Sequence, residues 1–185
     1  MPAVAKILGV KTPALYHHFD SREALISEIG QQVFADMPIP SPDPENWRQW
    51  LHDINMQLYQ FIMANPMLIE AADSPQGFLA LTLNLCEAIL ETLQEAGFEQ
   101  QQSYWTMLTL TQIAYSAARN EVEGRSTDTS RSEFLFEQIK QITEQNPRSA
   151  EFMRSLPQNN NREWLDQLLR WSIECIPEPN PKRAL

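Results

Sequence analysis

A short helix with an exposed polar face is predicted close to the N-terminus. Over Pro13–Phe19 the apolar residues Leu15 and Phe19 are four apart, so they point to the same side of a helix. Thr12 offers a hydroxyl N-cap, and proline suits the first helical position. The side chains that can make hydrogen bonds or small apolar contacts on the other side are Lys11, Thr12, Ala14, Tyr16 and His17. A helix start of this kind is suited to the major groove of DNA.

The neighbouring residues predict the elements that position this helix. Pro2–Leu8 reads as a helix with Val4, Ile7 and Leu8 directed inward, and Val10 is expected to fill the corner after it. Gly9 permits the positive φ that a tight turn between helices needs. Asp20–Ser21 is expected to cap a following helix whose inward residues are Ala24, Leu25 and Ile29. This order of helix, glycine turn and helix predicts a helix-turn-helix.

The segment Leu8–Leu25, LGVKTPALYHHFDSREAL, resembles the signature of the tetracycline-repressor (TetR) family. That signature reads Gly-Val, four intervening residues and Leu-Tyr-x-His-Phe, followed by Lys or Arg, Glu and Leu, and this chain matches at least seven of those positions. Weaker similarity continues through Asn46-Trp47-Arg48, Asn65-Pro66 and Ala96-Gly97-Phe98, so that it spans about residues 3–120.

The resemblance implies an all-α protein with a DNA-binding head and a helical body that binds a ligand and dimerises. It places at or near base edges Lys11, Thr12, Pro13, Ala14, Tyr16 and His17. His18 and Arg22 match positions that usually contact phosphate. The implied function is that of a ligand-responsive transcriptional regulator, a repressor, which binds a palindromic operator as a homodimer.

Two departures from the family pattern change what is expected. Only eight residues precede Gly9, so we expect the first helix of the family's head to be absent and DNA binding to be weak. The alternative function is therefore a non-catalytic helical dimer that binds a small ligand but has lost DNA binding. The family's magnesium-binding histidine falls on Ala72, and its drug-contacting positions fall on Ile54 and Leu58. Tetracycline, a metal ion and a cofactor are thus not expected.

Composition and charge agree with a helical protein whose body is acidic. Five glycines in 185 residues are few for a protein built on tight turns, and 43% hydrophobic residues are enough for a core. The net charge is −10, but residues 1–36 contain three basic side chains against four acidic ones and contribute only −1 of it. A protein coated with cations for nucleic acid is excluded, although local DNA contacts are not.

Proline runs predict how the chain divides. Pro38, Pro40, Pro42 and Pro44 alternate through a stretch that cannot be helical. The predicted parts are the DNA-binding head (1–36), an extended connector (37–45), the ligand-binding and dimerisation body (46–176) and a loose tail (177–185). Helices in the body are predicted over 46–64, 66–72, 76–96, 99–123, 131–145 and 162–176, with a short helical turn after Pro147.

Two functional surfaces are predicted in the body. An apolar effector cavity is expected among Trp50, Ile54, Leu58, Phe61, Ala72, Phe78, Asn84, Ala88 and Trp105, with Asn84 as its hydrogen-bonding group. Plain core packing is an equally good interpretation of these residues. Homodimerisation is expected through the Arg131–Gln145 helix and the last helix, whose predicted apolar face is Trp164, Leu165, Leu168, Trp171 and Cys175.

Other classes of function find little support. No acid, base and nucleophile recur at catalytic spacing, and His52 reads as a half-exposed histidine on a helix shoulder, so no enzyme is predicted. Cys86 and Cys175 read as small core residues of a protein in a reducing cytoplasm. No signal peptide and no membrane span are expected.

Overall fold

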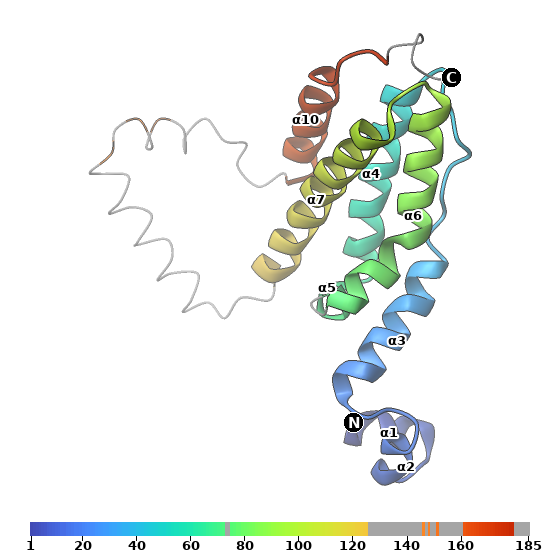
Figure 1. Cartoon of the computed structure of the whole chain (residues 1–185). Helices are drawn as coiled ribbons and strands as arrows, with labels where there is room; N and C mark the ends of the chain where they lie inside the picture. The colour runs from blue at the N-terminus through green and yellow to red at the C-terminus, as the bar shows by residue number, and fades with distance from the viewer. Residues whose placement is uncertain (73–74, 126–145, 147, 149–150, 152–160, 180–185) are drawn as a thin grey trace.

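The structure is a computed structural model of the chain that describes residues 1–72, 75–125, 146, 148, 151 and 161–179. For residues 75–81 and 125 only the backbone is described. Every regular element within these ranges is a helix, which confirms the all-α prediction. Three helices at the N-terminal end extend away from a bundle formed by the later ones (Figure 1).

The N-terminal end consists of α1 (Pro2–Leu8), α2 (Thr12–Tyr16) and α3 (Arg22–Ala35). The predicted glycine turn is confirmed, because Gly9 has φ 68° and caps α1. The predicted Ser21 cap is confirmed as well, since its hydroxyl oxygen accepts the backbone N–H of Ala24 at 3.0 Å. Local sequence chemistry therefore determines where α1 ends and where α3 begins.

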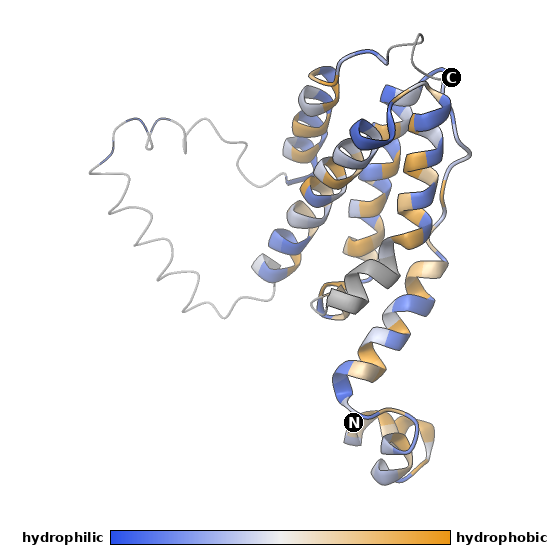
Figure 2. Cartoon of the chain, viewed as in Figure 1, coloured by the Kyte–Doolittle hydropathy of each residue, from blue (hydrophilic) through white to orange (hydrophobic). Residues whose placement is uncertain are grey.

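The bundle is built around α4 (Trp47–Ala64), which packs against α7 (Gln100–Arg125), α10 (Asn161–Glu174) and, less extensively, α5 (Met67–Ala72) and α6 (Pro75–Glu95). Apolar residues recur along these helices (Figure 2), and the buried ones among them form the hydrophobic core. The largest fully buried apolar side chains are Leu51, Ile54, Leu68, Leu85, Ile89, Leu93, Leu110, Leu165 and Leu169. α4 carries two apolar stripes, one with Leu51, Ile54 and Leu58 and a second with Met56 and Tyr59. These stripes explain its central place, because a helix that is apolar around most of its circumference must be covered on several sides.

Residues 37–46 form the non-helical link from α3 to α4, and this link is held against α4. Gln57 Nε2 donates to the carbonyl oxygen of Pro38 at 2.6 Å, and the indole Nε1 of Trp50 donates to that of Ser41 at 2.8 Å. Phe34 and Met37, on either side of the predicted boundary at residue 36, belong to the same buried core. The head is therefore connected to the body through packing as well as through the chain.

Several helix bounds match the predictions and others need correction. Gly97, with φ 96°, follows α6, and Phe98 packs edge-on against Trp47 with ring centroids 4.8 Å apart. α7 continues through Gly124, where an end was predicted, and reaches Arg125. The predicted 131–145 helix lies outside the described residues, as does most of the turn after Pro147.

Helical periodicity also assigned some apolar residues to the wrong side. Ile7, Leu8 and Val10 are 84%, 61% and 45% exposed, and the residue that α1 buries is Ala5. Three further residues that were expected inside are exposed: Ala24, Ile29 and Cys175. The start of the predicted tail is not loose, because Arg48 donates to Glu178 at 2.6 Å and to the carbonyl oxygen of Ile176 at 3.1 Å.

Candidate nucleic-acid interface and ligand cavity

The turn between α1 and α2 sets the direction of α2. The N–H groups of Gly9 and Val10 donate to the carbonyl oxygens of Lys6 (3.3 Å) and Ala5 (3.0 Å), which closes α1. Lys11 is extended and is the N-cap of α2, so the predicted Thr12 cap is wrong by one residue and no side chain caps the helix. Pro13 is the second residue of α2, one position later than predicted and still in the first turn, where its missing N–H does no harm.

Most of the predicted base-contacting side chains lie on the open side of α2. Leu15 is buried at 6% exposure, while Tyr16, next to it, is 50% exposed. Exposed positions are Lys11, Pro13, Tyr16, His17 and His18, and Thr12 and Ala14 are half-buried. Phe19, expected inside with Leu15, is also half-buried. The face has hydrogen-bonding groups and an aromatic ring, with Lys11 as its one lysine or arginine among the residues just named.

Arg22, the predicted phosphate-contacting cation, has a partner within the protein. Its guanidinium forms a two-point ion pair with the carboxylate of Glu70 on α5, through Nη1 with Oε1 and through Nη2 with Oε2, the latter at 3.2 Å. The hydrogen bond and the charge of Glu70 raise the pKa of Arg22, which therefore stays a cation. Sequence reasoning had no means of finding this pair, since its members are 48 residues apart.

The predicted effector residues do not gather around one cavity. Leu58 and Ala72 do line a small internal cavity, whereas Trp50 and Ile54 are buried in the surrounding core. Phe61 and Ala88 are half-buried against that core, with the ring of Phe61 5.8 Å from that of Phe34. Two assignments are corrected, because Asn84 is exposed and Trp105 is 58% exposed. The side chain of Phe78 lies outside the described residues.

The cavity that the structure does contain lies where α3, α4, α5, α6 and α7 meet. Its lining residues are Phe34, Leu58, Ile62, Leu68, Ala72, Thr82, Thr111 and Tyr115. Its volume of about 20 Å³ is room for about one water molecule. Ligand sites typically occupy 300 Å³ or more. An effector bound here must therefore separate helices that are in contact in this conformation.

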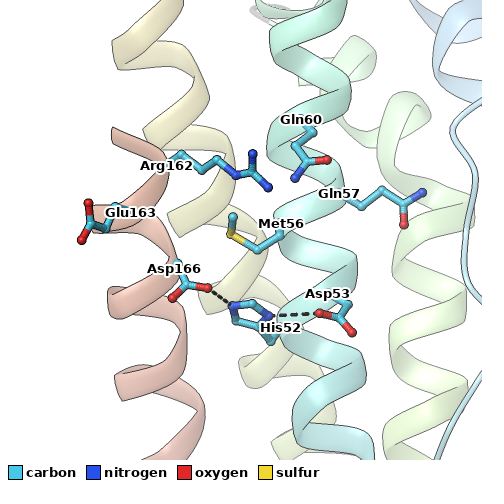
Figure 3. Close-up of a pocket in the computed structure, with 8 residues that line it drawn as sticks. All are labelled: His52, Asp53, Met56, Gln57, Gln60, Arg162, Glu163 and Asp166. Carbon is cyan, nitrogen blue, oxygen red and sulfur yellow. Dashed lines mark hydrogen bonds and ion pairs between the residues drawn. The ribbon is translucent and has the colours of Figure 1, made fainter. Parts of the chain in front are cut away.

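A second concavity, which the sequence did not predict, lies between α4 and α10 (Figure 3). This groove of about 640 Å³ is lined by His52, Asp53, Met56, Gln57, Gln60, Arg162, Glu163 and Asp166. His52 is only 6% exposed, so the prediction of a half-exposed shoulder residue is wrong. None of the lining residues is a serine, threonine or cysteine, so the groove offers His52 no hydroxyl or thiol nucleophile.

The His52 ring links the two helices electrostatically. Nε2 lies 2.8 Å from Oδ1 of Asp166 on α10, and Nδ1 lies 3.1 Å from Oδ1 of Asp53 (Figure 3). Arg170, one turn after Asp166, donates to the same carboxylate at 3.0 and 3.2 Å. The hydrogen bond from Arg170, and after it that from His52, lower the pKa of Asp166 against the effect of burial. This cluster stabilises the packing of α10 on α4.

Replacing Asp166 by alanine is expected to destabilise the protein by about 1–2 kcal/mol at pH 7, because a buried ring nitrogen of His52 loses its partner. The folded pKa of Asp166 lies below its ordinary value of 3.8, so its contribution is present above that pH and is lost as pH falls through the folded pKa. Urea unfolding should therefore show a difference between wild type and D166A that shrinks below about pH 4. Gln60→Ala, at an exposed position of the same groove, should change stability at neither pH. An equal loss at pH 7 and pH 2.5 would contradict this account.

The described part of the chain has neither a cluster of metal ligands nor a helix that could span a membrane. Within this part no three His, Cys, Asp or Glu side chains gather in a way that could hold a metal ion. None of the helices described is both long and apolar enough to cross a membrane.

Comparison with known proteins supports the interpretation of the N-terminal helices. The profile of the family described as "Bacterial regulatory proteins, tetR family" matches residues 1–29. The tetracycline repressor protein class A from transposon 1721 of Escherichia coli is 28% identical over 128 residues, which cover 66% of this chain and 57% of the relative. The chain thus matches less than two thirds of that relative's length.

The fold is similar to that of a solved structure. The crystal structure of the Streptomyces coelicolor TetR family protein ActR in complex with actinorhodin superposes with a TM-score of 0.66 at 17% identity. The similarity covers 94% of this chain and 86% of that protein. The bundle and the helices at its N-terminal end therefore share one architecture with that protein.

Proposed function

We propose that this chain, a protein of the TetR family of bacterial regulatory proteins, represses transcription by binding operator DNA as a dimer and releasing it when a small ligand binds. The observation that carries the proposal is the polar, exposed face of α2, held by the Gly9 turn at the far end of the molecule from most of the body (Figure 1). Such a helix can enter a major groove without a clash from the bundle. The proposed site of action is the cytoplasm, where operator DNA is accessible.

The proposed DNA contacts divide into two kinds. Base edges would be read by the residues on and beside α2, which are Lys11, Thr12, Pro13, Ala14, Tyr16 and His17. His18 and Arg22 would contact phosphate and set the orientation of the head. For Arg22 this requires a change in its pairing with Glu70.

The internal cavity offers a physical route from ligand to DNA. Leu68 and Ala72 of α5 and Phe34 of α3 line it together, and α5 packs against α3. A ligand larger than the cavity displaces these walls, and α3 carries the displacement to α2. In a dimer the two α2 helices must match successive major grooves about 34 Å apart, so a small rotation of α3 disfavours the DNA-bound state.

Gel-shift titration with DNA flanking the chain's own gene tests this function. A shifted band that competitor DNA of unrelated sequence does not remove supports it. Absence of any sequence-specific complex would support the alternative, a helical dimer that binds a ligand but does not bind DNA. The alternative has a physical basis, because residues 1–36 contain three basic side chains against four acidic ones and therefore attract DNA phosphates only weakly.

Filling the cavity is expected to remove the ligand response. In Ala72→Leu the three added carbon atoms exceed the free space of about 20 Å³ and displace the walls as a ligand would, so operator binding without effector should weaken and the remaining response to an effector should fall by about tenfold or more. Actinorhodin, present in the ActR complex, is the first compound to test, followed by a panel of small apolar compounds, with release of labelled DNA as the readout. Asn84→Ala is the matched control, because Asn84 is exposed. If N84A lost the response and A72L kept it, the ligand site would lie elsewhere.

A further inference from the structure

The ion pair between Arg22 and Glu70 occupies the one arginine of the N-terminal segment 1–36. Arg22 is the first residue of α3, directly after the Ser21 cap and six residues beyond the end of α2. Both side chains are about half exposed, at 52% and 49%. The pair is therefore open to solvent and to a large ligand that approaches the head.

The geometry of this pair is the geometry in which guanidinium binds phosphate. Two parallel contacts from one guanidinium to two oxygens suit a carboxylate and a phosphodiester equally well. While Nη1 and Nη2 both face Glu70, that edge of the guanidinium is not available to DNA. A phosphate that approaches Arg22 also meets the negative charge of Glu70.

We propose that Glu70 competes with the DNA backbone for Arg22, so that this carboxylate on the body lowers the affinity of the head for DNA. The inference rests on the proposed function, and it names Glu70 as the residue that limits the affinity for DNA. Glu70 belongs to α5 and not to the helices that approach DNA, so its effect depends on the packing of α5 against α3.

The competition for Arg22 matters because the head has few cations that could bind phosphate. Residues 1–36 contain Lys6, Lys11 and Arg22 as their only lysines and arginines. Each additional phosphate contact releases about one counterion and steepens the dependence of log K on log salt by about 0.9. Freeing Arg22 should thus steepen the slope of log K against log salt concentration by about one, and this slope is expected to be small in the wild type.

The test compares the full chain with Glu70→Gln, Arg22→Gln and the double variant. The probe is a fluorescein-labelled duplex of 30 base pairs of fixed, arbitrary sequence, titrated by anisotropy at several salt concentrations, since a phosphate contact does not depend on sequence. We expect E70Q to bind roughly three- to tenfold more tightly near 0.1 M salt, with a salt slope steeper by about one. R22Q should bind more weakly than wild type, and E70Q should bring no gain in the R22Q background.

Glu28→Gln is the matched control for charge alone. Glu28 is an exposed acid on the same helix as Arg22, with Gln32 as its hydrogen-bonding partner. The E28Q variant should bind the duplex less than twofold more tightly than wild type. Thermal unfolding of each variant, followed by circular dichroism, shows whether the head stays folded.

The possible outcomes separate this inference from the proposed function. The proposal is overturned if DNA binds but E70Q is within twofold of wild type, if E28Q gains as much as E70Q, or if the gain persists without Arg22. If neither wild type nor any variant binds this duplex or the flanking DNA, both the inference and the proposed function are wrong.

Discussion

Replacing Trp164 and Trp171 together by glutamate is expected to dissociate the proposed dimer into monomers. The two side chains are 39% and 65% exposed and are seven residues apart on α10, so they lie on the same side of the helix. The inner side of α10 is formed by Leu165, Leu169 and Ile173, all buried against the bundle. The exposed tryptophans are thus free of the core and available to a second copy.

The expected size of this effect follows from the energetics of protein interfaces. Buried tryptophans are frequent hot spots, and truncation of one typically costs 2 kcal/mol or more. In a two-fold symmetric interface each substitution acts twice, and four buried carboxylates would add repulsion. The dimer dissociation constant should rise by about 1,000-fold or more.

Sedimentation velocity at micromolar concentration provides the measurement. Leu83→Glu is the matched control, because Leu83 is a comparably exposed apolar residue, 51% exposed, on α6. It should remain dimeric. Cys175, exposed at the end of α10, gives an independent readout, because a maleimide should label it more slowly in the wild type than in the double variant. A wild type that sediments as a monomer would refute the dimer proposal, whereas a double variant that stays dimeric would place the interface elsewhere.

The substitution Tyr16→Ala is expected to remove most of the preference for operator DNA. Tyr16 is half exposed on α2 beside the buried Leu15, so its ring and hydroxyl extend from the surface that would enter the groove. One good base contact is worth about 1–3 kcal/mol of discrimination and occurs twice in a dimer. Operator affinity should therefore fall by about 30-fold or more.

The control for this variant is DNA without the operator. The phosphate contacts proposed for His18 and Arg22 do not involve Tyr16, so affinity for the arbitrary duplex should change by less than about threefold. Tyr16→Phe separates the two parts of the side chain, because it keeps the ring and removes the hydroxyl. Equal losses of affinity for both kinds of DNA would show that Tyr16 supports the fold of the head and does not read bases. Dimerisation should be unaffected.

The sequence by itself determined the helix-turn-helix and most helix bounds. Gly9, Ser21 and Gly97 act within a few residues of their own position, through a permitted φ or a single hydrogen bond to a nearby backbone group. The amount of apolar surface on α4 likewise suits its central place, because a helix that is apolar around most of its circumference must be covered on several sides. These properties depend on local chemistry, which a sequence displays directly.

Only the tertiary structure decided which side of a helix is covered and which distant side chains meet. On α10 the spacing allowed Trp164 and Leu165 to share one apolar face, but packing against α4 and α7 buried Leu165 and left Trp164 exposed. The pairs His52–Asp166 and Arg22–Glu70 are 114 and 48 residues apart. The spacing of apolar residues shows roughly which side of a helix is buried. It does not show which other helix covers that side. The covering helix decides whether a polar side chain such as His52 is buried, and the burial then decides which charge it pairs with.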